Sequence, residues 1–325
     1  MSLSAIPKLS SIAQRSGREF GLWDRAAMTS ALYGAPPSVL VELDGTESQT
    51  SPLIVGSKPL EVLKSNSIGR FLVAAPPGTL ERQYVLAHAL RGLKVGGELI
   101  AVAAKDKGGR RLKNELEGFG CVVEDEGRRH FRLSVTQKPA LLAGIDSALM
   151  GGAPREAGPG IWTQPGVFSW DRVDPGTERL LEHVDDLSGT GADFGCGLGI
   201  LSRRALRSPA IKAITLVDID RRAVDAARRN INDARATIVH DDVRTISLEA
   251  LNFVIMNPPF HDSGVEDRRL GQTFVRRAAA ALRRGGRLIM VANIALPYEA
   301  LLAELFVRVT VLDKGGGFKV FEAMK

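Results

Sequence analysis

The chain has 325 residues, of which 44% are hydrophobic and 25% are charged, and its net charge is +6 at neutral pH. This length exceeds one ordinary core, so we expect two domains, and the composition excludes a disordered or fibrous protein. No segment reaches the roughly 18 apolar residues of a membrane span, and no run resembles a signal peptide. The two cysteines, Cys121 and Cys196, have no metal-ligand spacing, which predicts reduced thiols, a cytoplasmic location and no metal site.

Three stretches of the first half predict the strands of one domain. They are an apolar run that ends in Pro-Pro, a Gly-Gly pair that leads into a second apolar run, and a hairpin, at residues 69–78, 92–104 and 119–135. Similar stretches recur in the same order in the second half, at residues 251–260, 281–293 and 305–324. Three matches in one order predict a duplicated domain.

The two copies differ where a site would lie. Ala75 stands where the second copy has Asn257, and Gly78 stands where it has Phe260. The first copy also lacks a glycine-rich turn. We therefore expect residues 1–145 to have the same fold as the second copy but no catalytic site.

A domain boundary is expected where glycine and proline crowd the chain, in "GIDSALMGGAPREAGPGIWTQPG". Hydrophobic periodicity disappears there, which is typical of a linker. Residues 146–164 are therefore predicted to connect the first domain to a catalytic domain at residues 165–325.

Strands and helices alternate regularly in this second domain. The expected strands are residues 190–194, 213–219, 236–240, 251–256 and 286–292, and the expected helices are residues 200–206, 221–231 and 272–282. This alternation indicates an α/β fold with a parallel sheet covered on both faces. The chain then ends in a predicted antiparallel hairpin that turns at residues 315–317.

A glycine turn, "DFGCGLG", joins the first of these strands to the first helix. Gly195, Gly197 and Gly199, with Cys196 among them, allow a tight turn that a ligand can approach closely. Asp193 precedes the turn, and its carboxylate would repel a pyrophosphate but suits a cationic amine or a sulfonium. The turn therefore predicts a site for S-adenosylmethionine rather than for a dinucleotide. A plain strand-to-helix corner capped by Asp193 is the alternative.

Two further carboxylates follow the next strands of the sheet. Asp218 ends the second strand and is placed to accept hydrogen bonds from ribose hydroxyls. Asp242 follows the third strand and could accept from the adenine amine. Because Asp241 stands beside it, a purely structural role for Asp242 also remains open.

The stretch "VIMNPPF" ends a buried strand with an amide, two prolines and an aromatic ring. In open α/β sheets the active crevice lies at the carboxyl ends of the strands. Asn257 and the carbonyl of Pro258 could together accept from an exocyclic base amine, and Phe260 offers a face for stacking on the base. The alternative is a Pro-Pro strand terminator with Phe260 in a core.

Together, the glycine turn, Asp218 and "NPPFH" resemble class I S-adenosylmethionine-dependent methyltransferases that modify amines. The longer stretches "PGVFSWDRVDPGTERLL", "VANIALPYEALL" and "GGGFKVFEAMK" resemble the ribosomal RNA small subunit methyltransferase C family. The resemblance is strong over residues 160–325 and loose over residues 1–145. It implies two tandem Rossmann-like class I methyltransferase domains, the N-terminal one degenerate, and methylation of guanine N2 in 16S rRNA of the small ribosomal subunit.

The resemblance also implies roles for single residues. It places Phe168 and Gly176-Thr177 near the methionine end of the cofactor. It assigns cofactor binding and guanine binding to residues already singled out above: Asp193, Gly195, Gly197 and Asp218 for the first, and Asn257, Pro258 and Phe260 for the second. The family often has asparagine where this chain has Asp242, so the chain departs from the family pattern at the expected adenine contact.

Arg268 and Arg269 follow the predicted base-binding loop and are candidates for contacts with RNA phosphates. Three alternatives remain open from the sequence. The substrate could be guanine in 23S rRNA, adenine N6, or a release-factor glutamine, because the Asn-Pro-Pro motif serves all of these. A binding module without activity is a further reading, which the intact glycine turn and Asn257 oppose.

Overall fold

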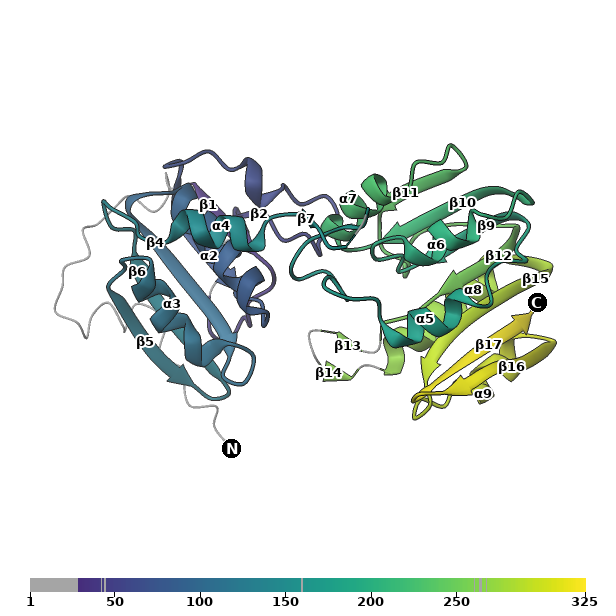
Figure 1. Ribbon diagram of the computed structural model, residues 1–325. Helices are drawn as coiled ribbons and strands as arrows, with labels where there is room; N and C mark the ends of the chain where they lie inside the picture. Colours follow the sequence, from purple (N-terminus) through teal and green to yellow (C-terminus); the bar gives the residue numbers. More distant parts are fainter. Residues whose placement is uncertain are drawn as a thin grey trace, which may run out of the picture. The chain divides into compact units, whose positions relative to one another are not determined.

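The computed structural model describes residues 29–325, except residues 42, 44, 159, 260, 263, 264 and 267. The chain divides into two compact units, Met1–Ala153 and Pro154–Lys325, and each has its own sheet (Figure 1). In the part of the chain that is described, no helix combines the length and the apolar character needed to cross a membrane. The same residues contain no cluster of side chains suited to holding a metal ion.

Within the described residues, the first unit forms a six-stranded sheet in the order β2-β1-β3-β4-β6-β5. The strands are β1 Ser30–Tyr33, β2 Ser48–Gln49, β3 Ile68–Ala74, β4 Leu93–Ala104, β5 Val123–Arg128 and β6 Phe131–Gln137. The first four are parallel, and β5 and β6 form an antiparallel hairpin at one edge. The helical segments are η2 Leu60–Val62, α2 Thr79–Gly92, η3 Gly109–Arg111, α3 Leu112–Gly118 and α4 Ile145–Gly152.

The second unit contains a seven-stranded sheet among its described residues, in the order β11-β10-β9-β12-β15-β17-β16. Its strands are β9 Gly189–Phe194, β10 Ile211–Asp218, β11 Ala236–His240, β12 Leu251–Met256, β15 Leu282–Asn293, β16 Arg308–Gly315 and β17 Phe318–Met324. Its helices are α5 Pro175–Leu181, α6 Ile200–Ala205, α7 Arg221–Asn230, α8 Arg268–Ala281 and α9 Glu299–Leu305. Two short pairs, β7 Arg155–Glu156 with β8 Trp162–Thr163 and β13 His261–Asp262 with β14 Val265–Glu266, lie outside this sheet.

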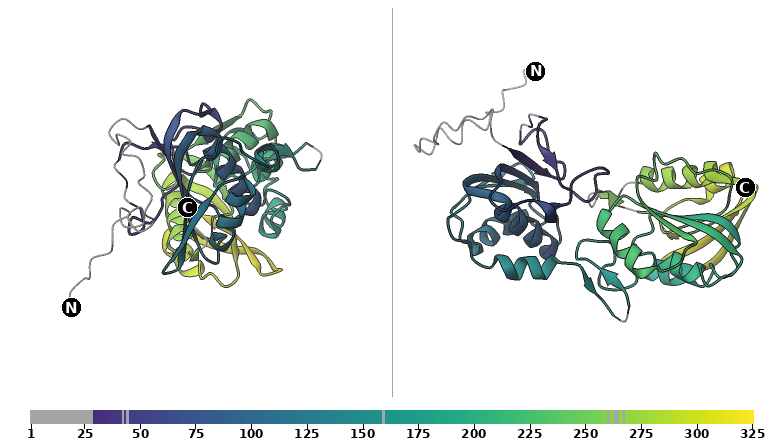
Figure 2. Two further views of the ribbon diagram at one scale, coloured as in Figure 1. Left: turned by 90° about the vertical axis from the view of Figure 1, so that its left-hand side faces the viewer. Right: turned by 90° about the horizontal axis from the view of Figure 1, so that it is seen from above.

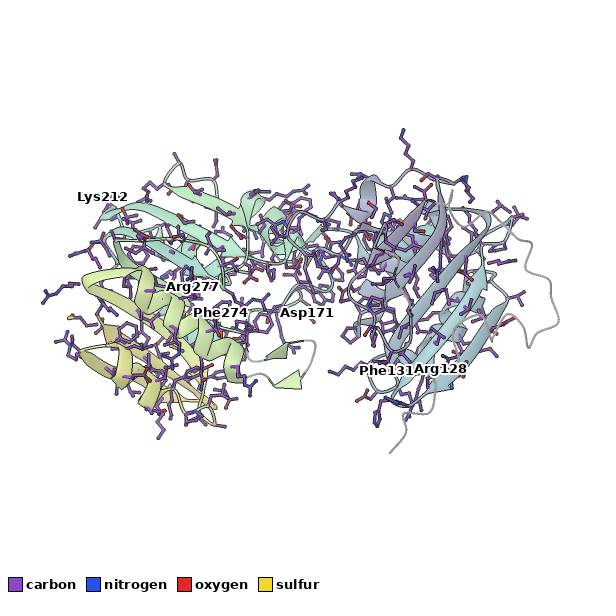
Figure 3. The ribbon with its side chains drawn as sticks, turned by 180° about the vertical axis from the view of Figure 1, so that it is seen from behind. Arg128, Phe131, Asp171, Lys212, Phe274 and Arg277 are labelled. Atoms are coloured by element: carbon purple, nitrogen blue, oxygen red, sulfur yellow. The ribbon has the colours of Figure 1, made fainter. Side chains whose placement is uncertain are left out.

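Helices cover both faces of the second sheet, as Figure 2 shows in the view from above. Along β10, β12 and β15, alternate residues enter two separate apolar clusters, as the two-residue period of a strand requires. On β12, for example, Val254 joins the cluster of α8 and α9, whereas Ile255 joins the cluster of α5 and α6. Phe274 and Arg277 both project from α8 (Figure 3), and the Phe274 ring is buried in the first of these clusters.

The strands predicted in the second half are confirmed, and so are the two hairpins. The two sheets also share their order: β1, β3, β4, β6 and β5 lie in the positions of β9, β12, β15, β17 and β16. In both units a Pro-Pro pair follows the central strand, after β3 and after β12. The two sheets therefore share the order of these five strands.

The segment expected to be a linker is more ordered than predicted. Helix α4 occupies its first part and packs on α2 of the first unit. Later in the segment, the buried side chain of Asn230 on α7 donates to the carbonyl of Trp162 at 3.0 Å and accepts from its N–H at 2.6 Å. These bonds attach β8 to the second unit. The glycine-rich and proline-rich sequence of this segment did not predict the attachment, because Trp162 and Asn230 are 68 residues apart in the chain.

Candidate functional site

A pocket of about 530 Å³ opens at the carboxyl ends of the strands of the second sheet. Its walls come from the loop before α5, from the glycine turn and from α6. Six of the residues predicted from the sequence line it: Phe168, Thr177, Gly195, Cys196, Gly197 and Asn257. Asp193, Gly199, Asp218, Asp242 and Pro258 do not line it directly. The structure therefore brings the glycine turn and the Asn-Pro-Pro loop to one cavity.

The glycine turn requires glycine for conformation and for space. Gly195, Gly197 and Gly199 have φ angles of 72°, 53° and 77°, in the left-handed region that side chains disfavour. A Cβ at Gly199 would lie 2.8 Å from the side chain of Ile231, so that glycine lets α6 approach α7. A Cβ at Gly197 would meet no described atom within 4 Å and would project into open space at the pocket. The backbone at Gly197 is therefore exposed to a ligand.

Asp193 lies beneath this turn and is completely buried. Its Oδ2 accepts a hydrogen bond from the hydroxyl of Ser202 at 2.7 Å, but its Oδ1 has no partner among the described residues. Burial raises the pKa of Asp193 to about 7, against the bond from Ser202 and with some repulsion from Asp218. A buried carboxylate oxygen without a donor costs free energy, which a cation nearby would offset.

Asp218, at the end of β10, holds the turn from the other side. Its Oδ2 accepts from the N–H of Gly197 at 2.8 Å, and its Oδ1 accepts from the N–H of Asp220 at 2.8 Å. Burial raises the pKa of Asp218 to about 6, although these backbone bonds oppose the shift. Each carboxylate oxygen keeps a second lone pair, so Asp218 can still accept from a pair of hydroxyls.

Cys196, between the glycines, is buried and is not an activated nucleophile. Burial raises the pKa of its thiol well above the ordinary value, and the carboxylates of Asp218 and Asp193 add to the effect. Its thiol instead faces the carbonyl of Gly197 at 3.7 Å. Cys196 lines the pocket and behaves there as a small apolar side chain.

Asp242 is engaged within its own turn. Its Oδ1 accepts from the backbone N–H of Arg244 at 2.8 Å, and the guanidinium of Arg244 binds both carboxylate oxygens. Partial burial opposes ionisation, but these bonds outweigh it and lower the pKa of Asp242. The predicted contact with an adenine amine would therefore have to share a carboxylate that an arginine already holds.

Asn257 follows β12 and has a defined orientation. Its Nδ2 donates to Asp174 Oδ2 at 2.9 Å and to Thr177 Oγ1 at 3.0 Å. Among the described residues, none donates a hydrogen bond to its Oδ1. Asn257 therefore presents an unoccupied carbonyl oxygen as it lines the pocket.

The rest of the predicted site is only partly described. Pro258 is buried, directly after Asn257. Phe260 lies outside the described residues. Arg268 begins α8, and Arg269 is exposed one residue later in that helix. Phe168 lines the pocket with 66% of its surface exposed, which leaves its ring accessible to a ligand.

Two features of the pocket were not singled out from the sequence. One is Asp174, whose only local signal was its place ahead of Pro-Gly-Thr at a helix start. The other is a set of arginines in the lining, Arg172, Arg203, Arg204 and Arg207. Arg204 is paired with Asp185, and the other three add positive charge to the wall of the pocket.

The arrangement suits S-adenosylmethionine better than a phosphate-bearing nucleotide. Asp193 offers an unpartnered buried oxygen for a cation, and the open backbone at Gly197 gives room for close approach. Asn257 lines the same cavity, and no described residue donates to its Oδ1, so this oxygen is available to accept from an N–H group.

Comparison with known proteins agrees with this chemistry. A sequence profile described as "Methyltransferase small domain" matches residues 159–322, about half of the chain. The ribosomal RNA small subunit methyltransferase C of Pseudomonas fluorescens is 33% identical over 247 residues, 74% of each chain. Its namesake from Yersinia pestis is 34% identical over 257 residues, 76% of this chain and 72% of that one.

A solved structure extends the likeness over nearly the whole chain. The 16S rRNA N2 G1207 methyltransferase of T. thermophilus, in complex with AdoMet and guanosine, is 25% identical and covers 97% of this chain and 91% of its own. The TM-score is 0.74, so the protein has the same α/β methyltransferase fold with mixed sheets. By profile, by identity and by structure, the chain belongs to the ribosomal RNA small subunit methyltransferase C family.

Proposed function

We propose that this protein transfers a methyl group from S-adenosylmethionine to the exocyclic N2 amine of a guanine in 16S rRNA. The named relatives and the guanosine-bound structure of the T. thermophilus enzyme support this reaction. The observation that carries it here is the orientation of Asn257, whose NH₂ group is held by Asp174 and Thr177 while its carbonyl remains available in the pocket.

The cofactor would be held by the glycine turn and the carboxylates around it. Asp193 would face the cationic part of the cofactor, and Asp218 would accept from the ribose hydroxyls. Gly195, Gly197 and Gly199 would allow the backbone to approach closely, with Phe168 and Thr177 beside the methionine portion. We propose a weaker contribution from Asp242, because Arg244 already binds its carboxylate.

When bound, S-adenosylmethionine supplies a methyl group on a sulfonium, which an amine can displace in line. A guanine amine is a poor nucleophile because its lone pair is delocalised into the ring. Asn257 Oδ1 and the carbonyl of Pro258 would accept from its two N–H groups, hold it in line and favour a pyramidal nitrogen. Phe260 would stack on the base. The amine loses a proton after transfer, and that proton can leave to water.

We propose that residues 1–145 form a degenerate domain, residues 146–164 a connection, and residues 165–325 the catalytic domain. In the first unit, the loop equivalent to Asn257-Pro258 is Ala75-Pro76, which supplies no carboxamide. The completely buried guanidinium of Arg82 also donates to the carbonyls of Pro76 and Pro77, at 3.2 and 2.7 Å. The acceptors that would hold a base amine are therefore occupied.

We propose that the enzyme modifies 16S rRNA within the small ribosomal subunit, in the cytoplasm. Arg268 and Arg269 would contact RNA phosphates next to the base-binding loop. The net charge of +6 is compatible with such a partner.

Transfer of a labelled methyl group tests the proposal. Purified 30S particles, 50S particles and free rRNA would be offered with labelled S-adenosylmethionine, and the product would be digested to nucleosides. We expect N2-methylguanosine from 30S particles or 16S rRNA. A label on adenine, on 23S rRNA alone or on a protein glutamine would contradict the proposal and identify the alternative.

A further inference from the structure

A carboxamide can present either of two faces to a ligand. Its oxygen accepts a hydrogen bond and its NH₂ group donates, and the two ends have nearly the same shape. If Asn257 presented its NH₂ group to the pocket, it would repel an amine and attract a ring nitrogen or a carbonyl. The direction of this one side chain therefore decides which substrate atom the site can hold.

The surroundings of Asn257 allow only one direction. An ionised carboxylate accepts hydrogen bonds and cannot donate them, so Asp174 Oδ2 must face the Nδ2 atom, at 2.9 Å. A flipped carboxamide would set its carbonyl against this carboxylate. Thr177 Oγ1, at 3.0 Å, does not impose a direction, because a hydroxyl can donate as well as accept. Asp174 is therefore the residue that selects the orientation.

Asp174 is itself held firmly by the start of α5. It is the N-cap residue of that helix, and the same Oδ2 atom that binds Asn257 also accepts from the N–H of Thr177 at 2.9 Å. Pro175 occupies the first turn, where its fixed φ suits a helix start. A Cβ at Gly176 would lie 3.0 Å from Asp174 Oδ2 and 3.0 Å from the ring of Phe318. The sequence Asp-Pro-Gly-Thr thus fixes the oxygen by the backbone on which it sits.

We propose that Asp174 is a positioning residue, which keeps the carbonyl of Asn257 facing the pocket and restricts the methyl acceptor to atoms that carry an N–H. This inference rests on the proposed function and adds to it a reason for selectivity. The ring nitrogens N3 and N7 and the O6 carbonyl of guanine, which can only accept, find no donor at Asn257. An exocyclic amine finds its acceptor.

Two substitutions at residue 174 separate positioning from charge. Asp174→Asn removes the charge but keeps an oxygen that can cap α5 and accept from Asn257. Asp174→Ser also keeps a capping oxygen, but this shorter hydroxyl no longer reaches Asn257 as an obligate acceptor. We expect kcat to stay within about threefold for Asp174→Asn and to fall by about 10- to 100-fold for Asp174→Ser, with KM for RNA little changed.

A matched control comes from a carboxylate outside the pocket. Asp225 is exposed on α7, pairs with Arg228 at 3.1 Å and is not among the residues that line the pocket. Asp225→Ser should leave kcat unchanged. Full activity of Asp174→Ser would overturn the proposal. An equal loss in Asp174→Asn and Asp174→Ser would assign the effect to charge and would overturn it too.

A measurement on the free protein keeps this test independent of the proposed reaction. With asparagine labelled by ¹⁵N, the carboxamide signal of Asn257 is identified by its absence in Asn257→Ala. Its protons should exchange slowly with water in the parent and in Asp174→Asn, and rapidly in Asp174→Ser. Rapid exchange in the parent would overturn the inference even where methyl transfer is observed. Slow exchange without any methyl transfer to RNA would instead leave the inference standing and reject the proposed function.

Discussion

The carboxylate of Asp193 accepts a hydrogen bond from the hydroxyl of Ser202 at 2.7 Å through one oxygen and leaves the other buried without a donor. The pairing is incomplete because Ser202 on α6 donates to Oδ2, whereas no described residue donates to Oδ1. Burial raises the pKa of Asp193 to about 7 from an ordinary value of 3.8. The incomplete pairing makes Asp193 responsive both to pH and to a cationic ligand.

The contribution of Asp193 to the stability of the free protein should therefore fall as the pH rises from about 4 to about 7. His88, whose pKa burial lowers to about 4, acts in the opposite direction over much of this window, so the contribution of Asp193 is the difference between the parent and Asp193→Asn. The folded state binds a proton at Asp193 that the unfolded state releases near its ordinary pKa, so the folded state is favoured at the acidic end of this window. The raised pKa of Asp218, about 6, acts in the same direction. Denaturant unfolding at several pH values measures the effect, and Asp193→Asn should flatten it. A stability that rises through this window in the parent, and equally in Asp193→Asn, would contradict the assignment.

Cofactor affinity should have the opposite dependence on pH. A cationic group near Asp193 favours the ionised carboxylate, so S-adenosylmethionine should bind more tightly as the pH rises from about 5.5 to about 8. Calorimetric titration at each pH measures the dissociation constant. Asp193→Asn should bind more weakly at the upper end and lose the dependence, and an unchanged profile would exclude contact between Asp193 and the cationic part of the cofactor.

Gly197→Ala tests whether the open backbone of the glycine turn receives the cofactor. Alanine at a positive φ should cost about 1–2 kcal/mol of folding free energy, and the new methyl group would occupy the space intended for ligand. Gly285→Ala is the matched control, because Gly285 also has a positive φ, 75°, and no described neighbour within 4 Å of a Cβ. Both variants should lose similar stability, but only Gly197→Ala should lose about tenfold or more in cofactor affinity. Equal cofactor affinities in Gly197→Ala and Gly285→Ala would show that the cofactor does not bind at this turn.

The sequence predicted the parts of the site that follow from strand order. Gly197, Asp218 and Asn257 each lie at or just beyond the carboxyl end of a short apolar strand, and a parallel sheet brings such ends to one edge. Their convergence could therefore be predicted without knowing any tertiary contact. The same reasoning works for the first unit, where Pro-Pro follows the central strand at the equivalent place.

What the sequence did not predict depends on contacts between distant residues or on local competition. Asp174 and Asn257 are 83 residues apart, and nothing in either segment indicates that one will orient the other. Asp242 was assigned to the cofactor from its position after β11, but Arg244, two residues later, binds its carboxylate within the same turn. Arg82 had no signal at all, because a buried arginine is recognised only by the carboxylate and carbonyls that surround it.

Asn257→Ala should separate binding from catalysis. We expect kcat to fall by about 10²- to 10³-fold because the amine loses its aimed acceptor, while the affinity for S-adenosylmethionine stays near that of the parent. Asn252→Ala is a control within β12, the strand that Asn257 follows, and Asn252 accepts from the backbone N–H of Thr190 at 3.0 Å. It should lose some stability and keep kcat. Near-normal turnover by Asn257→Ala would refute the role of the carboxamide.

Replacement of both Arg268 and Arg269 by alanine tests the proposed contacts with phosphates. Each lost contact with a single strand should reduce the slope of log K against log salt by about 0.7 and weaken RNA binding at low salt. Arg283 and Arg284 form an exposed pair in β15, and their double replacement removes the same charge elsewhere. The control should change the slope less, and identical slopes for both double variants would discard the assignment of Arg268 and Arg269.

Arg82 and Glu115 form a buried bidentate ion pair in the first unit, with both bonds at 2.7 Å. Arg82→Met should destabilise that unit by about 3–5 kcal/mol, because Glu115 is left buried without its partner. Arg82→Met combined with Glu115→Leu should recover much of the loss, since an apolar pair of similar volume needs no compensation. Denaturant unfolding measures both changes.

Methyl transfer per folded molecule should be the same in the double variant as in the parent. Arg82 binds the carbonyls of Pro76 and Pro77, in a loop that has no carboxamide and that we expect to take no part in the reaction. A change in kcat at equal folded fraction would show that the first unit contributes to catalysis and would contradict its description as a degenerate copy.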